Sequence, residues 1–195
     1  MACQSCHLRQ EATADRRDIQ EISHRPWMFV GEGPGGVEDE YGVPLVGPSG
    51  QLLDKALWSV GLTRDRVYVT NIVKCRPKNN RTPTLDEGRH CADIHLVKEI
   101  DLVQPKVIVC LGKVAFQYFY GKAASIMRNR GKWFTWRGYP VMPTYHRLSS
   151  AADRARPGRI EMAGLLRFQA AVEKAKAETP DYIYQSPEKT NLLAQ

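Results

Sequence analysis

Four of the five cysteines are spaced as the ligands of a metal centre often are. Cys3 and Cys6 form a C-x2-C pair in polar sequence, and Cys75 and Cys91 form a C-x15-C pair farther along the chain. Four thiolates from two separated segments can complete a tetrahedral zinc site or hold a cubane iron–sulfur cluster, and spacing alone does not choose between them. The alternative, that Cys6, Cys75 and Cys91 are small buried apolar residues, explains a cysteine pair in polar sequence poorly. Cys110 lies within an apolar run, and we expect it to be a core residue.

A glycine-rich segment, GEGPGG at 31–36, follows the short apolar run 27–30. Its backbone amides and the one carboxylate can cradle an anion or a nucleobase. It lacks the Gly-Lys-Ser/Thr of a phosphate-binding P-loop and the full dinucleotide fingerprint, and a glycine-rich turn is often only a turn. The candidate site residues of this segment are Gly31, Glu32, Gly33, Pro34 and Gly35.

Two further polar side chains stand where strand-like runs end. Asn71 lies near the end of a run rich in β-branched residues, and a carboxamide can both donate to and accept from a nucleobase edge. His146 follows another such run, and an imidazole can donate a hydrogen bond to developing negative charge. Taken singly, a strand-end asparagine and a surface histidine are the more ordinary interpretations.

Basic residues flank these segments in two groups. A formal net charge of +7 favours an anionic partner, because Lys and Arg displace counterions from phosphates. The groups are consistent with a phosphate-tracking surface around a pocket, and a solvated charged face is the alternative. They are Lys74, Arg76, Lys78 and Arg81, then Arg128, Arg130, Lys132 and Arg137, with Trp133 and Trp136 interleaved in the second.

The elements that must position these residues alternate between strand and helix patterns. Apolar and β-branched runs predict strands at 27–30, 67–73, 107–111, 133–136 and 140–144. Helices are predicted after Ser49 as far as Gly61, from Thr84 to about Val103, from Gly112 through Tyr120, and over 160–176. Thr84 and Glu87 have the spacing of a capping box. This order predicts a three-layer α/β/α domain, in which ligands lie outside the carboxyl ends of the strands.

Length and composition set the class of protein. We expect one domain over residues 1–178 and a polar tail at 179–195. Apolar residues make up 43% and charged residues 25%, which excludes a disordered or collagen-like chain. No apolar stretch reaches the length of a membrane span, and the N-terminus lacks a secretory leader, so we expect a cytoplasmic protein without a membrane partner.

Taken together, these segments resemble the uracil-DNA glycosylase superfamily, and within it the iron–sulfur type called family four. The resemblance spans about residues 3–175 and rests on several motifs in order. They are the Cys3–Cys6 pair, VGEGPG at 30–35, PLVG at 44–47, GQLLD at 50–54, YVTNIVKCRP at 68–77, Cys91, PKVIV at 105–109, LG at 111–112, RGKW at 130–133, and the position of His146.

The resemblance implies a central sheet of four parallel strands and a 4Fe–4S cluster on Cys3, Cys6, Cys75 and Cys91. It implies a monomer that acts on uracil in single- or double-stranded DNA, associated with the nucleoid, and leaves an abasic site after base flipping. His146 would hydrogen-bond uracil O2, Asn71 would read the O4/N3 edge, and Glu32 would orient water. Arg76, Lys78, Arg130 and Lys132 would contact DNA.

Two positions depart from the family pattern. Relatives usually have phenylalanine where this chain has Leu45, which keeps an apolar contact with the base but no aromatic face. After His146, relatives usually continue with Pro and Tyr, whereas this chain has Arg147 and Leu148. Leu148 is the candidate wedge into the duplex and Arg147 a candidate phosphate ligand.

The departures leave two alternatives to an active uracil-DNA glycosylase. One is a DNA-binding member of the same fold with weakened catalysis or altered base preference. The other, from a different class, is a four-cysteine zinc or redox module whose basic charge is incidental.

Overall fold

The computed structural model describes residues 3, 6–11, 25–145, 173 and 177. Its centre is a five-stranded sheet with the strand order β2-β1-β3-β5-β4. β1, β2, β3 and β5 run parallel, and β4 pairs antiparallel with β5. The strands are β1 (Trp27–Gly31), β2 (Val67–Asn71), β3 (Val107–Leu111), β4 (Phe134–Trp136) and β5 (Tyr139–Thr144).

The four parallel strands that were expected are therefore confirmed. The sheet also has a fifth strand, β4, at its edge, so the expected total of four strands is wrong. β4 returns antiparallel because only Arg137 and Gly138 connect it to β5. Both residues have positive φ, 47° and 86°, which suits the tight hairpin turn whose twist matches that of the strands. A parallel connection needs a crossover of about a dozen residues or more, so this short link excludes one.

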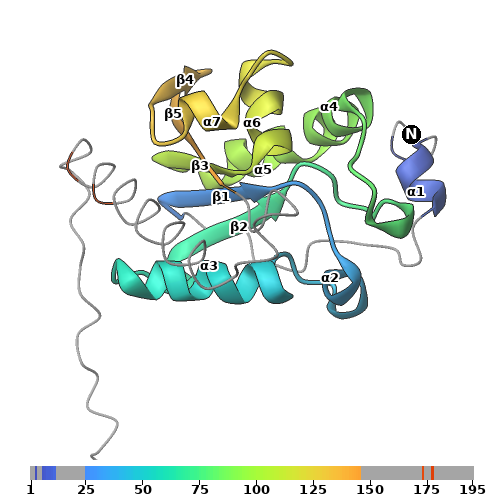
Figure 1. The fold of residues 1–195 in the computed structure, drawn as a ribbon, viewed down its shortest axis with the longest axis horizontal. Helices are drawn as coiled ribbons and strands as arrows, with labels where there is room; N and C mark the ends of the chain where they lie inside the picture. Colours follow the sequence, from blue (N-terminus) through green and yellow to red (C-terminus); the bar gives the residue numbers. More distant parts are fainter. Residues whose placement is uncertain (1–2, 4–5, 12–24, 146–172, 174–176, 178–195) are drawn as a thin grey trace, which may run out of the picture.

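Helices cover both faces of the sheet, which makes the three layers that were predicted (Figure 1). α3 lies on one face, and α4, α5 and α6 lie on the other. The helices are α1 (His7–Glu11), α2 (Gly36–Tyr41), α3 (Pro48–Ser59), α4 (Leu85–Ile94), α5 (Leu96–Val103), α6 (Lys113–Tyr120) and α7 (Ile126–Asn129), with single 3₁₀ turns η2 (Arg64–Arg66) and η3 (Lys78–Asn80).

Alternate residues of β1 show how the two halves of the core form. Met28 and Val30 join the buried cluster under α4, α5 and α6, whereas Trp27 and Phe29 join the cluster under α3. Side chains of a strand alternate between the faces of its sheet, so a strand covered on both faces is apolar throughout. Cys110 is fully buried in the first cluster, as expected of a core residue.

The helix predictions hold in outline and differ at their ends. The Thr84 hydroxyl accepts from the Glu87 amide at 3.2 Å, and the Glu87 carboxylate accepts from the Thr84 amide at 2.7 Å, so the capping box is confirmed. The single helix predicted from there is divided into α4 and α5 at His95, where φ is −111°. α1 was not predicted, and Leu8 anchors it in the core with 1% exposure.

The helix predicted over 160–176 and the tail at 179–195 lie outside the described residues, apart from Glu173. Within the part of the chain that the structure describes, we find no helix with the length and apolarity to cross a membrane.

Candidate functional site

The carboxyl ends of β1 and β2 bring the glycine-rich segment against Asn71. The parallel register pairs Gly31 directly with Asn71. Beyond the strands, the Ile72 amide donates to the Gly31 carbonyl at 2.9 Å, and the Val73 amide donates to the Glu32 carbonyl at 3.1 Å. These bonds extend the ladder past the sheet and hold the two loops side by side.

The Asn71 carboxamide fills the space that glycine leaves at position 31. Asn71 is 4% exposed, and a β-carbon on Gly31 would overlap its Oδ1 atom. Among the described residues, this buried oxygen has no hydrogen-bond partner. A buried acceptor without a donor costs about 1–3 kcal/mol, so the geometry suits a ligand that supplies an N–H.

Leu45 lies at the same point. Its Cδ1 atom is 3.5 Å from the position that a β-carbon on Gly31 would take. The side chain is buried, and the backbone is left-handed with a φ of 51°. Leu45 packs with the core cluster under α3 and is an apolar neighbour of the Gly31–Asn71 pair.

Glu38 ties together the two loops that form this site. One carboxylate oxygen accepts from the Gly35 amide at 3.1 Å, and the other accepts from the Gly47 amide at 2.8 Å. Glu38 is 8% exposed, and its bond with the Gly47 amide is buried whereas that with the Gly35 amide is partly buried. Glu38 was not among the predicted site residues, although its position three residues after Gly35, at the start of a helix, is that of a capping-box glutamate.

Glu32 lies at the edge of the site, partly buried. Burial raises the pKa of its carboxyl above the ordinary value of 4.5, and a hydrogen bond with Thr82 offsets part of that rise. Gly33 packs closely on the segment after β2, since a β-carbon there would approach Cγ2 of Val73 to 2.6 Å. Pro34 is buried beside it.

Arg76 and Lys78 follow the same strand and lie near the glycine-rich segment. The Arg76 guanidinium approaches the Cα side of Gly36, pairs with Asp39 at 4.0 Å and donates to Asn80 at 2.7 Å. Lys78 is exposed. Both can therefore present positive charge near the site.

Two other members of that basic group, Lys74 and Arg81, pair with carboxylates. Lys74 is buried, and its ammonium pairs with Glu99 at 2.6 Å. Arg81 binds Glu87 through two bonds of 2.7 and 2.8 Å. The inclusion of Lys74 in a phosphate-tracking surface is therefore corrected, because it is buried against Glu99 on α5, whereas the Arg81 side chain remains 38% exposed.

Arg130 reaches the carboxyl end of β5. The amide of Gly131 donates to the Pro143 carbonyl at 2.8 Å, which draws this loop to the strand. The Arg130 guanidinium lies 4.8 Å from the centre of the Tyr145 ring, a cation–π contact. Lys132 is close to Arg130 in the chain. The predicted site residues His146, Arg147 and Leu148 lie outside the described residues.

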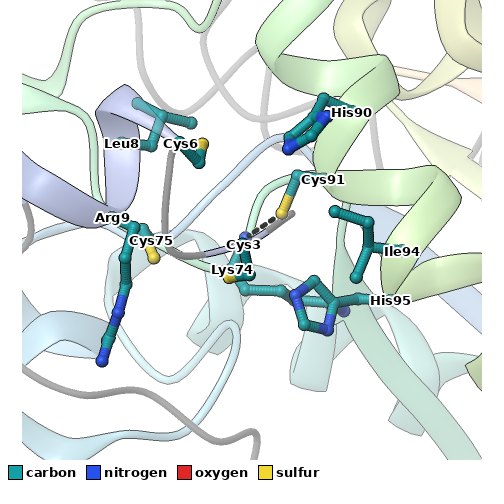
Figure 2. A pocket seen from close by; sticks show the side chains of 10 residues that line it. All are labelled: Cys3, Cys6, Leu8, Arg9, Lys74, Cys75, His90, Cys91, Ile94 and His95. Carbon is teal, nitrogen blue, oxygen red and sulfur yellow. Dashed lines mark hydrogen bonds between the residues drawn. The ribbon is translucent and has the colours of Figure 1, made fainter. Parts of the chain in front are cut away.

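The four candidate metal ligands surround a second site. Cys3, Cys6, Cys75 and Cys91 line a cavity of about 260 Å³ between α1, the segment after β2, and α4 (Figure 2). Arg9, Lys74 and two histidines of α4 and its end, His90 and His95, complete the wall together with Leu8 and Ile94.

The donors around this cavity include four thiols and two imidazoles, side chains that bind soft and borderline metals. Within the described part of the chain, no three His, Cys, Asp or Glu side chains are arranged to hold a single metal ion. The Lys74 amide donates to Cys91 Sγ at 3.3 Å, a bond that stabilises a ligating sulfur (Figure 2). Burial raises the pKa of the Cys91 thiol to about 12, although the hydrogen bond from the Lys74 amide and the Lys74 charge lower it in part. Coordination would supply the positive charge that ionises these thiols.

Comparison with known proteins gives a consistent result. The family model described as "Uracil DNA glycosylase superfamily" matches residues 20–162. A protein named type-4 uracil-DNA glycosylase from Thermotoga maritima is 47% identical over 121 residues, which are 61% of this chain and 62% of the relative. The protein of that name from Sulfurisphaera tokodaii is 44% identical over 61% of this chain and 58% of the relative. The one from Saccharolobus solfataricus is 39% identical over 74% of this chain and 70% of the relative. The matched region thus spans about 60% of the length of the first two relatives.

Proposed function

The chain belongs to the uracil-DNA glycosylase superfamily, and on that basis we propose that it hydrolyses the N-glycosidic bond of deoxyuridine in DNA. The products are free uracil and an abasic site, as in base-excision repair. Relatives of 39–48% identity carry the name type-4 uracil-DNA glycosylase. The observation that carries the proposal is the buried, unpaired Oδ1 of Asn71 at the carboxyl edge of the sheet, unpaired among the described residues.

Asn71 can select uracil by its hydrogen-bonding pattern. Its Oδ1 would accept from N3–H of uracil, while its amide nitrogen would donate to O4. Cytosine presents the opposite pattern on the same edge, an acceptor at N3 and an amino donor at C4. A cytosine would therefore leave the buried oxygen unpaired, which disfavours its binding. Leu45 would contact the ring of the bound base.

The remaining roles follow from charge. Cleavage leaves negative charge on the departing uracil and positive character on the sugar. In the proposed mechanism His146 hydrogen-bonds uracil O2 as that charge grows, and the amides of the glycine-rich segment hold the base. Glu32 orients the water that attacks the sugar. The target nucleotide must leave the DNA stack to reach these groups.

We propose a 4Fe–4S cluster on Cys3, Cys6, Cys75 and Cys91. The four thiols line one cavity. The hydrogen bond from the Lys74 backbone amide to Cys91 Sγ is of the kind that stabilises cluster ligands. The cluster would serve as a structural crosslink between the N-terminal segment, β2 and α4. Cys75 is next to Arg76, so the same crosslink would order the loop that carries Arg76 and Lys78.

The DNA partner would be held by basic side chains around the pocket. Arg76 and Lys78 lie beside the glycine-rich segment, and Arg130 lies beside Tyr145. We propose that the protein acts as a monomer on chromosomal DNA in the cytoplasm. The proposed DNA contacts are Arg76, Lys78, Arg130, Lys132, Arg147 and Leu148.

A single-turnover assay on matched oligonucleotides tests the activity. The substrates carry uracil opposite guanine, uracil opposite adenine, single-stranded uracil, hypoxanthine, or no lesion. Uracil release by the parent protein should collapse in Asn71→Ala and in His146→Ala. Thr135→Ala, on the exposed edge strand β4, is the control and should keep the parent rate. Retained DNA binding with no base release would instead identify a repurposed binding protein.

A further inference from the structure

The backbone of Leu45 is held by contacts on the side away from Gly31 and Asn71. Its φ of 51° places a non-glycine residue in the left-handed region, which persists only where the surroundings fix it. On one side of the backbone, the side chain approaches Gly31 and Asn71. On the other, the carbonyl oxygen lies so close to Gly50 in the first turn of α3 that a β-carbon there would overlap it.

Arg64 holds this carbonyl. The residue comes from η2, the 3₁₀ turn before β2, and its Nη2 donates to the Leu45 carbonyl oxygen. Its Nε donates to Asp54 Oδ1 on α3 at 2.5 Å, so one guanidinium joins the carbonyl to the helix. The Arg64 side chain is one-third exposed, and the planar guanidinium keeps the two bonds in a fixed relative direction.

The far end of the same loop has its own anchor, the bond from the Gly47 amide to Glu38. Leu45 therefore has two anchors on its C-terminal side, its own carbonyl and the Gly47 amide. Without Arg64, the carbonyl loses its donor while the Gly47 anchor remains, and the backbone of Leu45 can relax toward negative φ. That rotation would move the Leu45 side chain relative to Gly31 and Asn71.

We propose that Arg64 is a positioning residue that sets, through the Leu45 carbonyl, where the Leu45 side chain lies against the bound base. Arg64 therefore affects the affinity for the base only indirectly, by holding the backbone carbonyl of Leu45. The inference rests on the proposed function for the identity of the base. Asp54 supports Arg64 from α3 and has the smaller effect of the two.

A double-mutant cycle tests this coupling. Arg64→Met keeps the length of the side chain and removes its donors. We expect roughly tenfold weaker inhibition by free uracil, the loss typical of one charged hydrogen bond. In the Leu45→Ala background, the same replacement should change uracil affinity little. Arg64→Lys keeps one charged donor and should restore most of the affinity. Thermal melting of each variant reports any effect on the fold.

A second readout does not depend on activity. A nuclear Overhauser effect (NOE) between a Leu45 methyl group and the Gly31 α-protons should be present in the parent and lost in Arg64→Met. If Arg64→Met melts early, Asp54→Asn tests the same coupling and should weaken both the NOE and uracil affinity to a smaller extent.

The outcomes separate the two proposals. An unchanged NOE in Arg64→Met overturns the positioning role of Arg64, and so does an equal loss of affinity with and without the Leu45→Ala replacement. A parent protein that neither releases uracil from DNA nor binds free uracil contradicts the proposed function, and the NOE then decides the positioning role alone.

Discussion

Gly31 and Asn71 are paired across β1 and β2, and the Asn71 carboxamide occupies the space next to the Gly31 α-carbon that any other residue would fill. Position 31 requires glycine because a β-carbon there would overlap the Asn71 side chain, and not because of an unusual backbone conformation. The close approach also needs the parallel register, because a shift by one residue would turn Asn71 to the other face of the sheet. Asn71 Oδ1, buried and unpaired among the described residues, is thereby aimed at one place beside Leu45.

Gly31→Ala should displace the Asn71 side chain and lower the rate of uracil release at least tenfold, as a misplaced polar contact in the pocket does. The control is Thr135→Ala on the exposed edge strand β4, which has no role in the proposed site. Single-turnover rates and thermal melting of both variants check the prediction. A Gly31→Ala protein with the parent rate would show that Asn71 does not read the base from this position.

Glu38→Gln should destabilise the loops that form the pocket. The carboxylate accepts from the Gly35 and Gly47 amides with separate oxygens, and glutamine offers only one acceptor oxygen for two donors. We expect the free energy of unfolding to fall by about 1–3 kcal/mol. Denaturant unfolding measures it, with Glu40→Gln on the exposed side of α2 as the control. Equal stabilities of the two variants would contradict the anchoring role of Glu38.

Glu32 should give the activity an acidic limit above that of an ordinary glutamate. Burial raises the pKa of its carboxyl, so the ionised form that orients water is lost as pH falls through this raised value. The pH dependence of single-turnover rates should show this limit in the parent, and Glu32→Gln should be slow with no such limit. An identical limit in Glu32→Gln would assign it to another group.

The same shift predicts the effect of Glu32 on stability, with the opposite sign. Because the pKa is raised in the folded state, the folded state is stabilised when the Glu32 carboxyl is neutral. This stabilisation is lost as pH rises through the raised pKa. Glu32→Gln should therefore gain stability relative to the parent above that pH and not below the ordinary value of 4.5. Unfolding free energies measured across this range test it.

Cys75→Ser should abolish the visible absorption of anaerobically purified protein and lower its melting temperature. Cys75 is one of four thiols around the same cavity, and a 4Fe–4S cluster absorbs visible light whereas zinc does not. Cys110→Ala is the control, because Cys110 is buried in the core under α4, α5 and α6 and its replacement should leave the colour unchanged. A coloured Cys75→Ser protein that melts normally would refute the cluster assignment.

The local elements could be read from the sequence because their causes are local. The apolar run 107–111 is a strand with those bounds, and Thr84 and Glu87 form the capping box that their spacing predicts. Asn71 could likewise be placed at a strand end, since the β-branched run before it predicts the strand. The prediction of its role came from the family resemblance, which covers several segments at once.

Other features depend on residues far apart in the chain, and only the tertiary structure decided them. Lys74 and Lys78 belong to one basic run, yet Lys74 is buried because Glu99, 25 residues away, lies under it, whereas Lys78 is exposed. Composition cannot distinguish the two, because the cost of burying a charge depends on whether a partner is already in place.

The contacts of the candidate site around Asn71 likewise depend on the tertiary structure. The sequence determined that a glycine-rich turn follows one strand and that Asn71 lies near the end of another, predicted over 67–73 and found to end at Asn71. It did not determine that Gly31 would face Asn71, that Glu38 would bind two loops, or that Arg64 would reach Leu45. These contacts join segments whose distances are set by strand order and helix packing, and the free energy of each depends on burial, which only the assembled fold defines.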